Sequence, residues 1–331
     1  MDPITQGALG ASLPQSLSHK DKLTTVTWLA CLSGMSPDMD VFIRSPSDPL
    51  LFLEFHRQFT HSLIFIPVGA LICCLLFYRW SRKNLDFKQS YVVCFLAYAT
   101  HALLDACTTY GTQLFWPFSD VRIAWNNVSV IDPLVTIPLV VLVVATYRSR
   151  KPLYARLGFT WVLVYLMIGV VQRDRAEAFG LELAQSRGHQ PVSLEARPGF
   201  GNLLVWKVIY EYDDHYYVDA IRTGRHSKVY PGQRIRKLDI KRDLPWLDPG
   251  SQQASDLERF AWFSGGYLAM DANRPNLVID MRYSIVPNEI DALWGIVLDP
   301  NRSNSQHVSY QTQRKVSPAS RSAVQKMFLG D

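Results

Sequence analysis

Residues 101 to 111 read His-Ala-Leu-Leu-Asp-Ala-Cys-Thr-Thr-Tyr-Gly, and they close an apolar segment that begins at Tyr91. On a helix, His101 and Asp105 are four residues apart, so both side chains leave the same face. Ionisable groups in an apolar helix are costly, and they usually face a bundle interior, a partner or a metal ion. Two interpretations are therefore open: the pair binds a metal, or it forms a His–Asp hydrogen bond that joins two helices.

The composition divides the chain of 331 residues, of which 48% are hydrophobic and 19% charged. The apolar residues concentrate in residues 1–172, for which we predict a helical membrane domain that carries the metal site. For residues 173–331 we predict an extracytoplasmic α+β domain. All five cysteines lie in the apolar part without a Cys-x-x-Cys pattern, so each is expected to be a buried small hydrophobe.

The first two apolar stretches, Ile4–Ser16 and Leu23–Met35, are too short to cross a bilayer, which takes ~20 residues. We expect a hairpin of short helices there. Such a hairpin returns Asp38 and Asp40 to the face where Gln6 starts.

Longer uncharged stretches follow, and they predict about four long membrane spans, at residues 62–78, 89–104, 128–147 and 157–172. Basic clusters follow the first and third of these, at residues 79–88 and 148–156. The net charge of +5 lies in such clusters beside apolar segments, which is typical of membrane topology and not of nucleic-acid binding. The predicted fold is an α-helical membrane bundle with an N-terminal short-helix hairpin, followed by a small α+β soluble domain. We expect a multi-pass protein of the bacterial inner membrane whose C-terminal domain is extracytoplasmic.

This topology brings six possible metal ligands to the extracytoplasmic side: Asp38, Asp40, His56, His61, His101 and Asp105. Three histidines and three aspartates could hold one or two divalent ions. Nitrogen and carboxylate ligands suit zinc best here, with manganese and iron as alternatives. For Asp38 and Asp40 alone, an ordinary helix-ending turn is the favoured interpretation.

Four motifs carry a resemblance to a known family: Met-Asp-Pro-Ile-Thr-Gln at the start, Ser-Pro-Asp-Met-Asp at 36–40, His-Arg-x-x-Thr-His-Ser at 56–62 and His-x-x-x-Asp at 101–105. Together with Asn126 to Pro133, they resemble the YdjM/YbcI-type family over roughly the first 170 residues. Its members are bacterial inner-membrane proteins described as membrane-bound metal-dependent hydrolases. The resemblance implies a metal site made of the six residues above. Many relatives have a histidine where this chain has Gln6, a poor zinc ligand that could instead position water or substrate.

The resulting hypothesis is a metal-dependent hydrolase of an ester or phosphoester in a lipid-like or envelope substrate. Asp38 or Asp40, whichever is not a ligand, would act as general base. Arg57, with Arg122, could stabilise negative charge, although an interfacial arginine at position 57 is an equally simple interpretation. The alternative is a non-enzymatic membrane protein with a structural metal or His–Asp network and a domain that binds an envelope protein. Membrane lipids are expected contacts in both cases.

The last part of the chain predicts a β-hairpin over residues 203–221, a helix over 251–270 and strands near 276–286 and 292–298. A charged helix is expected over 173–187. The polar tail over residues 301–322 is expected to be mobile.

Overall fold

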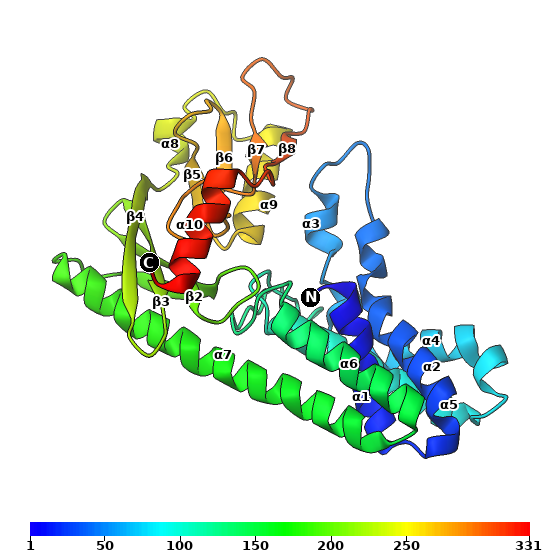
Figure 1. Ribbon diagram of the computed structural model, residues 1–331. Coiled ribbons are helices and arrows are strands. Elements are labelled where there is room, and N and C mark those ends of the chain that lie inside the picture. Colours follow the sequence, from blue (N-terminus) through cyan, green and yellow to red (C-terminus); the bar gives the residue numbers. More distant parts are fainter. The chain divides into compact units, whose positions relative to one another are not determined.

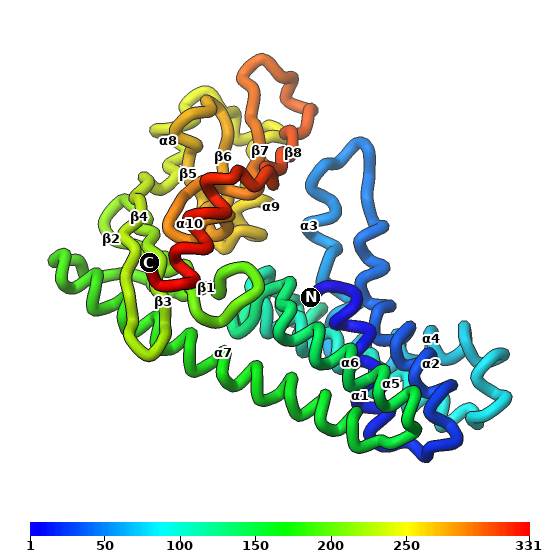
Figure 2. Tube along the Cα trace, in the orientation of Figure 1, coloured from blue at the N-terminus to red at the C-terminus, as the bar shows by residue number.

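The computed structural model describes residues 1–331, whose contacts divide them into two units (Figures 1 and 2). The first, which we call the helical unit, consists of Met1–Phe42, Phe55–Val171 and Phe200–Asn202. The second, which we call the β unit, consists of Ile43–Glu54, Gln172–Gly199 and Leu203–Asp331.

The helical unit begins with the hairpin that the sequence predicts. Helix α1 (Pro3–Leu17) starts after Asp2, whose side chain accepts a hydrogen bond from the Thr5 amide, and proline occupies the first helical position. A short 3₁₀ turn, η1 (Lys20–Lys22), leads into α2 (Leu23–Met35). A second 3₁₀ turn, η2 (Ser36–Phe42), then carries the Ser-Pro-Asp-Met-Asp motif.

Helix α5 (Phe87–Ala106) is the central element, because it contacts α1, α2 and α4 (Ile66–Ser81). It begins with a capping box in which the Asp86 carboxylate accepts from the Gln89 amide. Its buried face ends at His101 and Asp105. Two short elements, α3 (Leu51–Phe55) and η3 (Phe59–His61), precede α4.

Two further helices complete this part of the chain. Helix α6 (Pro133–Ser149) starts at Asp132, which caps it, and α7 (Pro152–Ser186) is continuous over 35 residues, about 52 Å. We had expected a span over 157–172 and a separate charged helix over 173–187. The structure joins them because no residue between them breaks a helix.

The prediction of about four long membrane spans is wrong. Only α7 is by itself long and apolar enough to cross a membrane. The segments Leu51–His61 and Ile66–Ser81, which meet at an angle of 86°, would make a second span if they are counted together as one. Helix α6 has 17 residues, which is short of the ~20 that a span needs. Helix α5 has 20 residues, but its buried face is interrupted by polar side chains, namely Ser90, Thr100, His101 and Asp105.

The turns that join α1 to α2, α4 to α5, and α6 to α7 meet at one end of the helical unit. The Lys22 ammonium donates to Gln89 Oε1 at 2.8 Å, and Asn84 Nδ2 donates to Thr25 Oγ1 at 2.7 Å. Arg150 donates to the Thr24 hydroxyl, and Arg156 Nε donates to the Ser16 carbonyl at 3.1 Å. The basic clusters of the sequence therefore lie together, at the end of α5 where Phe87 begins the helix.

The β unit contains two four-stranded antiparallel sheets, in the orders β1-β2-β3-β4 and β5-β6-β7-β8 (Figure 1). The strands of the first are β1 (Ser193–Pro198), β2 (Val205–Tyr212), β3 (His215–Arg222) and β4 (Lys228–Arg236). Those of the second are β5 (Leu268–Met270), β6 (Leu277–Asp280), β7 (Trp294–Val297) and β8 (Ser309–Thr312). Ile209, Tyr216 and Val218 of the first sheet share one core with Leu277 and Ile279 of the second.

We expected a small α+β domain, and the structure instead shows a two-sheet β domain. It contains three complete helices, α8 (Ile240–Asp243), α9 (Gln252–Phe263) and α10 (Pro318–Leu329), besides parts of α3 and α7. The predicted hairpin is confirmed as β2 and β3, which pair from Val205↔Arg222 to Tyr212↔His215. The predicted helix over 251–270 ends at Phe263, because Gly265 and Gly266 adopt positive φ. The tail predicted to be mobile contains β8 and the start of α10, whose Met327 is buried in a second core cluster.

Candidate metal centre

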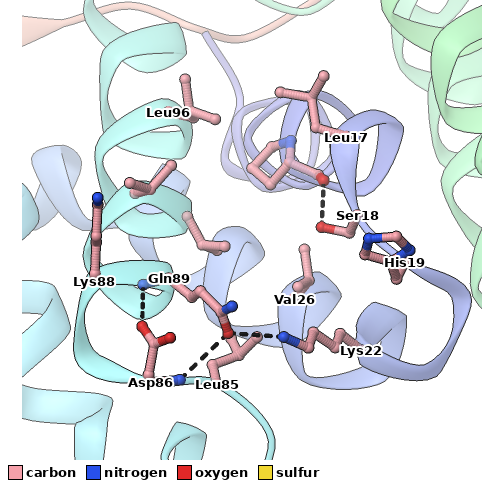
Figure 3. A pocket seen from close by; sticks show the side chains of 13 residues that line it. Leu17, Ser18, His19, Lys22, Val26, Leu85, Asp86, Lys88, Gln89 and Leu96 are labelled. Atoms are coloured by element: carbon pink, nitrogen blue, oxygen red, sulfur yellow. Dashed lines mark hydrogen bonds between the residues drawn. The ribbon is translucent and has the colours of Figure 1, made fainter.

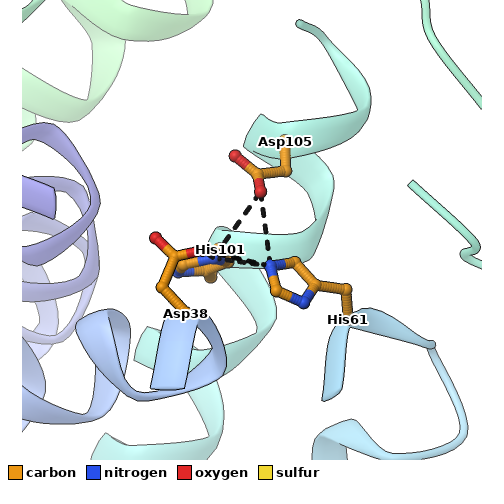
Figure 4. Close-up of side chains that lie close together, drawn as sticks. All are labelled: Asp38, His61, His101 and Asp105. Carbon is orange, nitrogen blue, oxygen red and sulfur yellow. Dashed lines mark hydrogen bonds and ion pairs between the residues drawn. The ribbon is translucent and has the colours of Figure 1, made fainter. Parts of the chain in front are cut away.

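Four side chains from three segments converge at the end of α5 that lies opposite the basic turns (Figure 4). Asp38 comes from η2, His61 from η3, and His101 and Asp105 from the last turns of α5. One ligand atom from each residue lies within 4.8 Å of all the others. His61, His101 and Asp105 are fully buried, whereas the Asp38 side chain is 19% exposed.

The distances between these donor atoms fit a four-coordinate metal ion. His61 Nε2 lies 3.5 Å from Asp38 Oδ1 and 3.3 Å from Asp105 Oδ2, and His101 Nε2 lies 3.4 Å and 3.7 Å from the same two oxygens. The two Nε2 atoms are 2.9 Å apart. A tetrahedral zinc ion with ligand bonds of about 2.0–2.1 Å separates its ligands by about 3.3 Å, which lies inside this range. Two neutral imidazole nitrogens this close repel unless a proton or a cation lies between their lone pairs.

Both histidines are held with Nε2 toward the cluster. His101 Nδ1 lies 2.6 Å from the Gly34 carbonyl, which can only accept, so Nδ1 carries the proton and the Nε2 lone pair is free. His61 Nδ1 lies 3.2 Å from Asp40 Oδ2 and 2.9 Å from Thr60 Oγ1. A carboxylate or carbonyl behind each ligating histidine is the usual way in which a metal ligand is oriented.

Asp40 and His56 lie beside the four-residue cluster and bind each other. Asp40 Oδ1 is 2.7 Å from His56 Nδ1, which is a hydrogen-bond distance and shorter than the ligand separations above. Asp40 Oδ2 also accepts from the Arg57 amide at 2.9 Å and from Thr60 Oγ1 at 2.7 Å. Asp38, Asp40 and His56 do form a second group of possible ligands, but Asp40 already has a donor on each oxygen.

The carboxylates of η2 stay ionised to low pH. Burial by itself raises the pKa of Asp40, but the hydrogen bonds from His56 and His61 outweigh it and hold the pKa well below its usual range. Burial likewise raises the pKa of Asp38, and hydrogen bonds from His101 and His61, together with the charge of His101, bring that pKa well below the usual value when no ion is bound and Nε2 carries a proton. Both groups are therefore anionic at neutral pH, Asp38 beside the two histidines and Asp40 within its own hydrogen bonds.

Asp105 is the most heavily partnered member of the cluster. Its Oδ2 is 2.9 Å from Arg57 Nε, and its Oδ1 accepts from Gln6 Nε2 at 2.8 Å and from the Met1 amino group. These donors compete with a metal for the Asp105 lone pairs. Asp105 Oδ2 and the buried Oε1 of Gln6 nevertheless have no hydrogen-bond partner in the structure, which leaves two acceptors at the cluster for a water molecule or a metal ion.

Arg57 is a buried part of the site and not an interfacial arginine. It adopts a positive φ of 65°, and its guanidinium lies over the Tyr110 ring at 5.0 Å and donates to Thr108 Oγ1 at 2.8 Å. Arg122 lies over the same Tyr110 ring, at 5.6 Å, and donates to the carbonyls of His56 at 3.3 Å and Gly111 at 3.0 Å. The sequence did not indicate Tyr110 or the Gly34 carbonyl, because a ring contact and a backbone acceptor leave no signal in residue spacing.

A third group of possible ligands, Asp48, Asp256 and His307, lies in the β unit. Arg259 already supplies positive charge there, because its NH2 is 2.8 Å from Asp48 Oδ2 and its NH1 is 2.9 Å from Asp256 Oδ1. His307 Nδ1 lies 3.0 Å from Asp256 Oδ2. We read this group as an ion-pair network.

Comparison with known proteins places the helical unit in a family. A family model described as YdjM inner membrane protein matches residues 1–176, a stretch that holds all the residues of the candidate metal centre. The inner membrane protein YbcI of Escherichia coli (strain K12) is 26% identical over 172 residues, 51% of this chain and 95% of YbcI. The protein YfhP of Bacillus subtilis (strain 168) is 25% identical over 164 residues, 49% of this chain, and the chain covers only 48% of YfhP. No solved structure matches significantly.

Proposed function

Because the chain belongs to the YdjM inner membrane protein family, we propose that it is a metal-dependent hydrolase of the inner membrane. The observation that carries this proposal is the set of distances, 2.9 to 3.7 Å, between the donor atoms of Asp38, His61, His101 and Asp105. In both histidines, an acceptor at Nδ1 turns Nε2 toward the cluster. Of the four, His61, His101 and Asp105 would hold the ion, which leaves one position beside Asp38 open for water, and zinc suits these ligands best. A zinc ion bound there supplies a Lewis acid and lowers the pKa of water that binds to it.

Asp38 is the better candidate for the general base. It is the cluster member with an exposed side chain, and only its Oδ1 is used in the contacts with the two histidines. Asp40, which we had considered for the same role, is engaged by donors on both oxygens and instead orients His61. Asp38 would therefore accept the proton of an attacking water molecule.

Arg57 would contribute to the reaction through its positive charge and through its ion pair with Asp105. Its Nε fixes Asp105 Oδ2 at 2.9 Å, and the buried guanidinium places a positive charge beside the cluster. A buried cation close to a reacting carbonyl or phosphoryl group favours the negative charge that develops on oxygen. The Tyr110 ring and Thr108 hold the guanidinium in that position.

We propose a lipid-like ester or phosphoester as substrate, since exposed apolar side chains lie on the same turn as the partly exposed Asp38. Met39 and Phe42, on the same turn as Asp38, are 62% and 74% exposed, and Ile4 on α1 is 66% exposed. Water does not favour such a surface, whereas an acyl chain or a membrane interface does. We place this face outside the cytoplasm, because the basic turns lie at the opposite end of α5.

The test is hydrolysis by the full-length, metal-loaded protein in detergent, with a panel of lipid-like esters and phosphoesters. We expect turnover that falls about 10²–10⁴-fold in Asp38→Asn, as the loss of a general base predicts. Asp21→Asn, in the exposed η1 turn, is the matched control and should keep full activity. The proposal fails if the panel remains intact while a known membrane hydrolase cleaves it in parallel.

One observation favours a second candidate, a non-enzymatic protein with a structural network. Arg57 forms an ion pair with Asp105, and Gln6 and the Met1 amino group donate to its Oδ1, so the charge of Asp105 is compensated within the chain without a metal. In that case the domain after α7 would bind an envelope protein. A protein whose thermal stability depends on His101 and Asp105, but which binds no metal and cleaves nothing, would favour this candidate.

A further inference from the structure

The basic end of the helical unit contains a pocket of about 430 Å³ that plays no part in the proposed hydrolysis (Figure 3). It lies between the turn that joins α1 to α2 and the beginning of α5. The distance along α5 from Lys88 to His101 is thirteen residues, about 20 Å, so the pocket and the metal centre are separate sites.

One side of the pocket is apolar. Its walls come from the end of α1 (Pro14, Leu17), from α2 (Val26) and from successive turns of α5 (Val92, Val93, Leu96). Val26 and Val93 are buried at the back, whereas Leu17 and Val92 are 68% and 44% exposed at the mouth. The apolar lining therefore continues onto apolar surface outside the pocket.

The other side of the pocket carries cations. Figure 3 shows Lys22 and Lys88 on either side of Gln89, with His19 beside Lys22. Lys22 Nζ donates to Gln89 Oε1, a neutral acceptor, at 2.8 Å, and neither lysine forms an ion pair. The one acidic side chain of the lining, Asp86, is used as the cap of α5, because it accepts from the Gln89 amide at 2.8 Å. The lining thus carries two lysines against one aspartate, beside an apolar wall.

We propose that this pocket binds one anionic phospholipid, with its phosphate between Lys22 and Lys88 and the upper part of one acyl chain along the apolar wall. A phospholipid is the ligand that presents a negative charge and a hydrocarbon chain side by side. A soluble anion would gain nothing from Val26, Val93 and Leu96. The volume is that of an ordinary small-molecule site, which fits a headgroup and part of a chain. The neighbouring Arg82 and Lys83 add to the attraction for an anionic leaflet.

The experiment is native mass spectrometry of the full-length protein, released from micelles that contain equal amounts of phosphatidylglycerol and phosphatidylcholine. We expect one retained phosphatidylglycerol per chain in preference to phosphatidylcholine. In Lys22→Gln/Lys88→Gln the preference should fall about thirtyfold, since each lysine near an anionic surface contributes about fivefold. The control Arg82→Gln/Lys83→Gln removes the same charge outside the pocket lining and should keep most of the preference.

A second variant tests the apolar wall. Val92→Trp places a large ring at the mouth, where the side chain is already exposed, and should prevent lipid retention without loss of folding. Thermal stability and a monodisperse elution profile report on the fold of each variant. Equal retention of the two lipids, equal loss in Lys22→Gln/Lys88→Gln and in the control double variant, or competition by glycerol phosphate as strong as that by the diacyl lipid would overturn the proposal.

Discussion

At the scale of single residues, the candidate site separates two aspartates that the sequence could not tell apart. Asp38 and Asp40 are two residues apart in a 3₁₀ turn, where successive side chains are rotated by about 120°. They therefore point to different neighbours: Asp38 faces the Nε2 atoms of His61 and His101, and Asp40 faces the Nδ1 side of His61. Residue type and topology were enough to select both, but only the local backbone decides which one faces the Nε2 atoms of the two histidines.

The role of Asp40 gives a direct prediction. In Asp40→Asn, His61 loses the carboxylate that orients it, and metal affinity should fall about 10–100-fold, as for other residues behind a ligand. Competition with a chromogenic chelator measures this affinity, and Asp21→Asn serves as the control. A loss as complete as that in His101→Ala would make Asp40 a ligand, and an unchanged affinity would remove it from the site.

A buried lysine in the β unit predicts a pH dependence of stability. Lys207 lies on β2, where Nζ donates to Ser284 Oγ at 2.8 Å and to the Glu289 carbonyl at 3.0 Å, and burial together with Arg197 lowers its pKa to about 7. The unfolded chain keeps an ordinary lysine pKa of about 10.4, so between these values only the unfolded state holds the proton. The free energy of unfolding should therefore rise with pH across this window, by up to about 1.4 kcal/mol per pH unit, and stay flat with respect to this group below pH 7.

The measurement is the urea midpoint of the full-length protein at pH 6.5, 8 and 9.5, for wild type and Lys207→Met. The urea midpoint of wild type minus that of Lys207→Met should increase as the pH rises, because methionine cannot titrate. Lys241→Met, at an exposed position, is the control and should show no such trend. A difference that stays constant from pH 6.5 to 9.5 would show that Lys207 is charged in the folded protein.

At the scale of elements, the close crossing of α1 and α2 determines the position of a histidine partner. A Cβ on Gly34 would lie 2.9 Å from the Gln6 carbonyl oxygen and 3.0 Å from Gly10 Cα, so only glycine allows this approach. The same Gly34 carbonyl receives the bond from His101 Nδ1. The packing of the hairpin and the orientation of a metal ligand are therefore coupled through one residue.

Gly34→Ala should separate the two helices, with a loss of stability of about 1–3 kcal/mol and a lower metal content. Thermal unfolding and elemental analysis of the purified variant measure the two effects. Gly250→Ala is the matched control, because its added Cβ meets only Asp248 Oδ1 at 3.6 Å. If the Gly34→Ala protein is destabilised but its metal content is normal, the packing of the hairpin and the orientation of His101 are not coupled, which would contradict this account.

The elements also show why hydropathy overestimated the number of spans. Apolar windows identified the stretches that became α4, α5 and α6, and they located the hairpin and the β2–β3 pair well. A hydropathy window cannot show whether the apolar face of a helix contacts lipid or other parts of the protein. Helix α5 contacts α1, α2 and α4, and the polar residues on its buried face were the one feature of its sequence that indicated contact with protein.

At the scale of the whole molecule, α7 is the one continuous helix that could cross the membrane. Its apolar half, up to Val171, belongs to the helical unit, and its charged half to the β unit. We expect Met167→Cys, at a position 63% exposed in the apolar half, to resist a water-soluble maleimide in intact membranes and to react with a membrane-permeant one. Glu182→Cys, on the charged half of the same helix, should react with both. Equal labelling of the two positions by the water-soluble reagent would contradict a span at α7.

The central claim is that the end of α5 holds a metal ion. The measurement that tests it most directly is the metal content of the detergent-purified protein by elemental mass spectrometry, for wild type, His101→Ala and Asp105→Ala. His226→Ala, an exposed histidine of the β unit, serves as control. We predict nearly one metal ion per chain in the wild type and control, and loss of the ion in the two site variants while they remain monodisperse. No metal in the wild type, even after reloading with zinc, manganese or iron, would leave His101 and Asp105 as a hydrogen-bond network and contradict the proposed hydrolase.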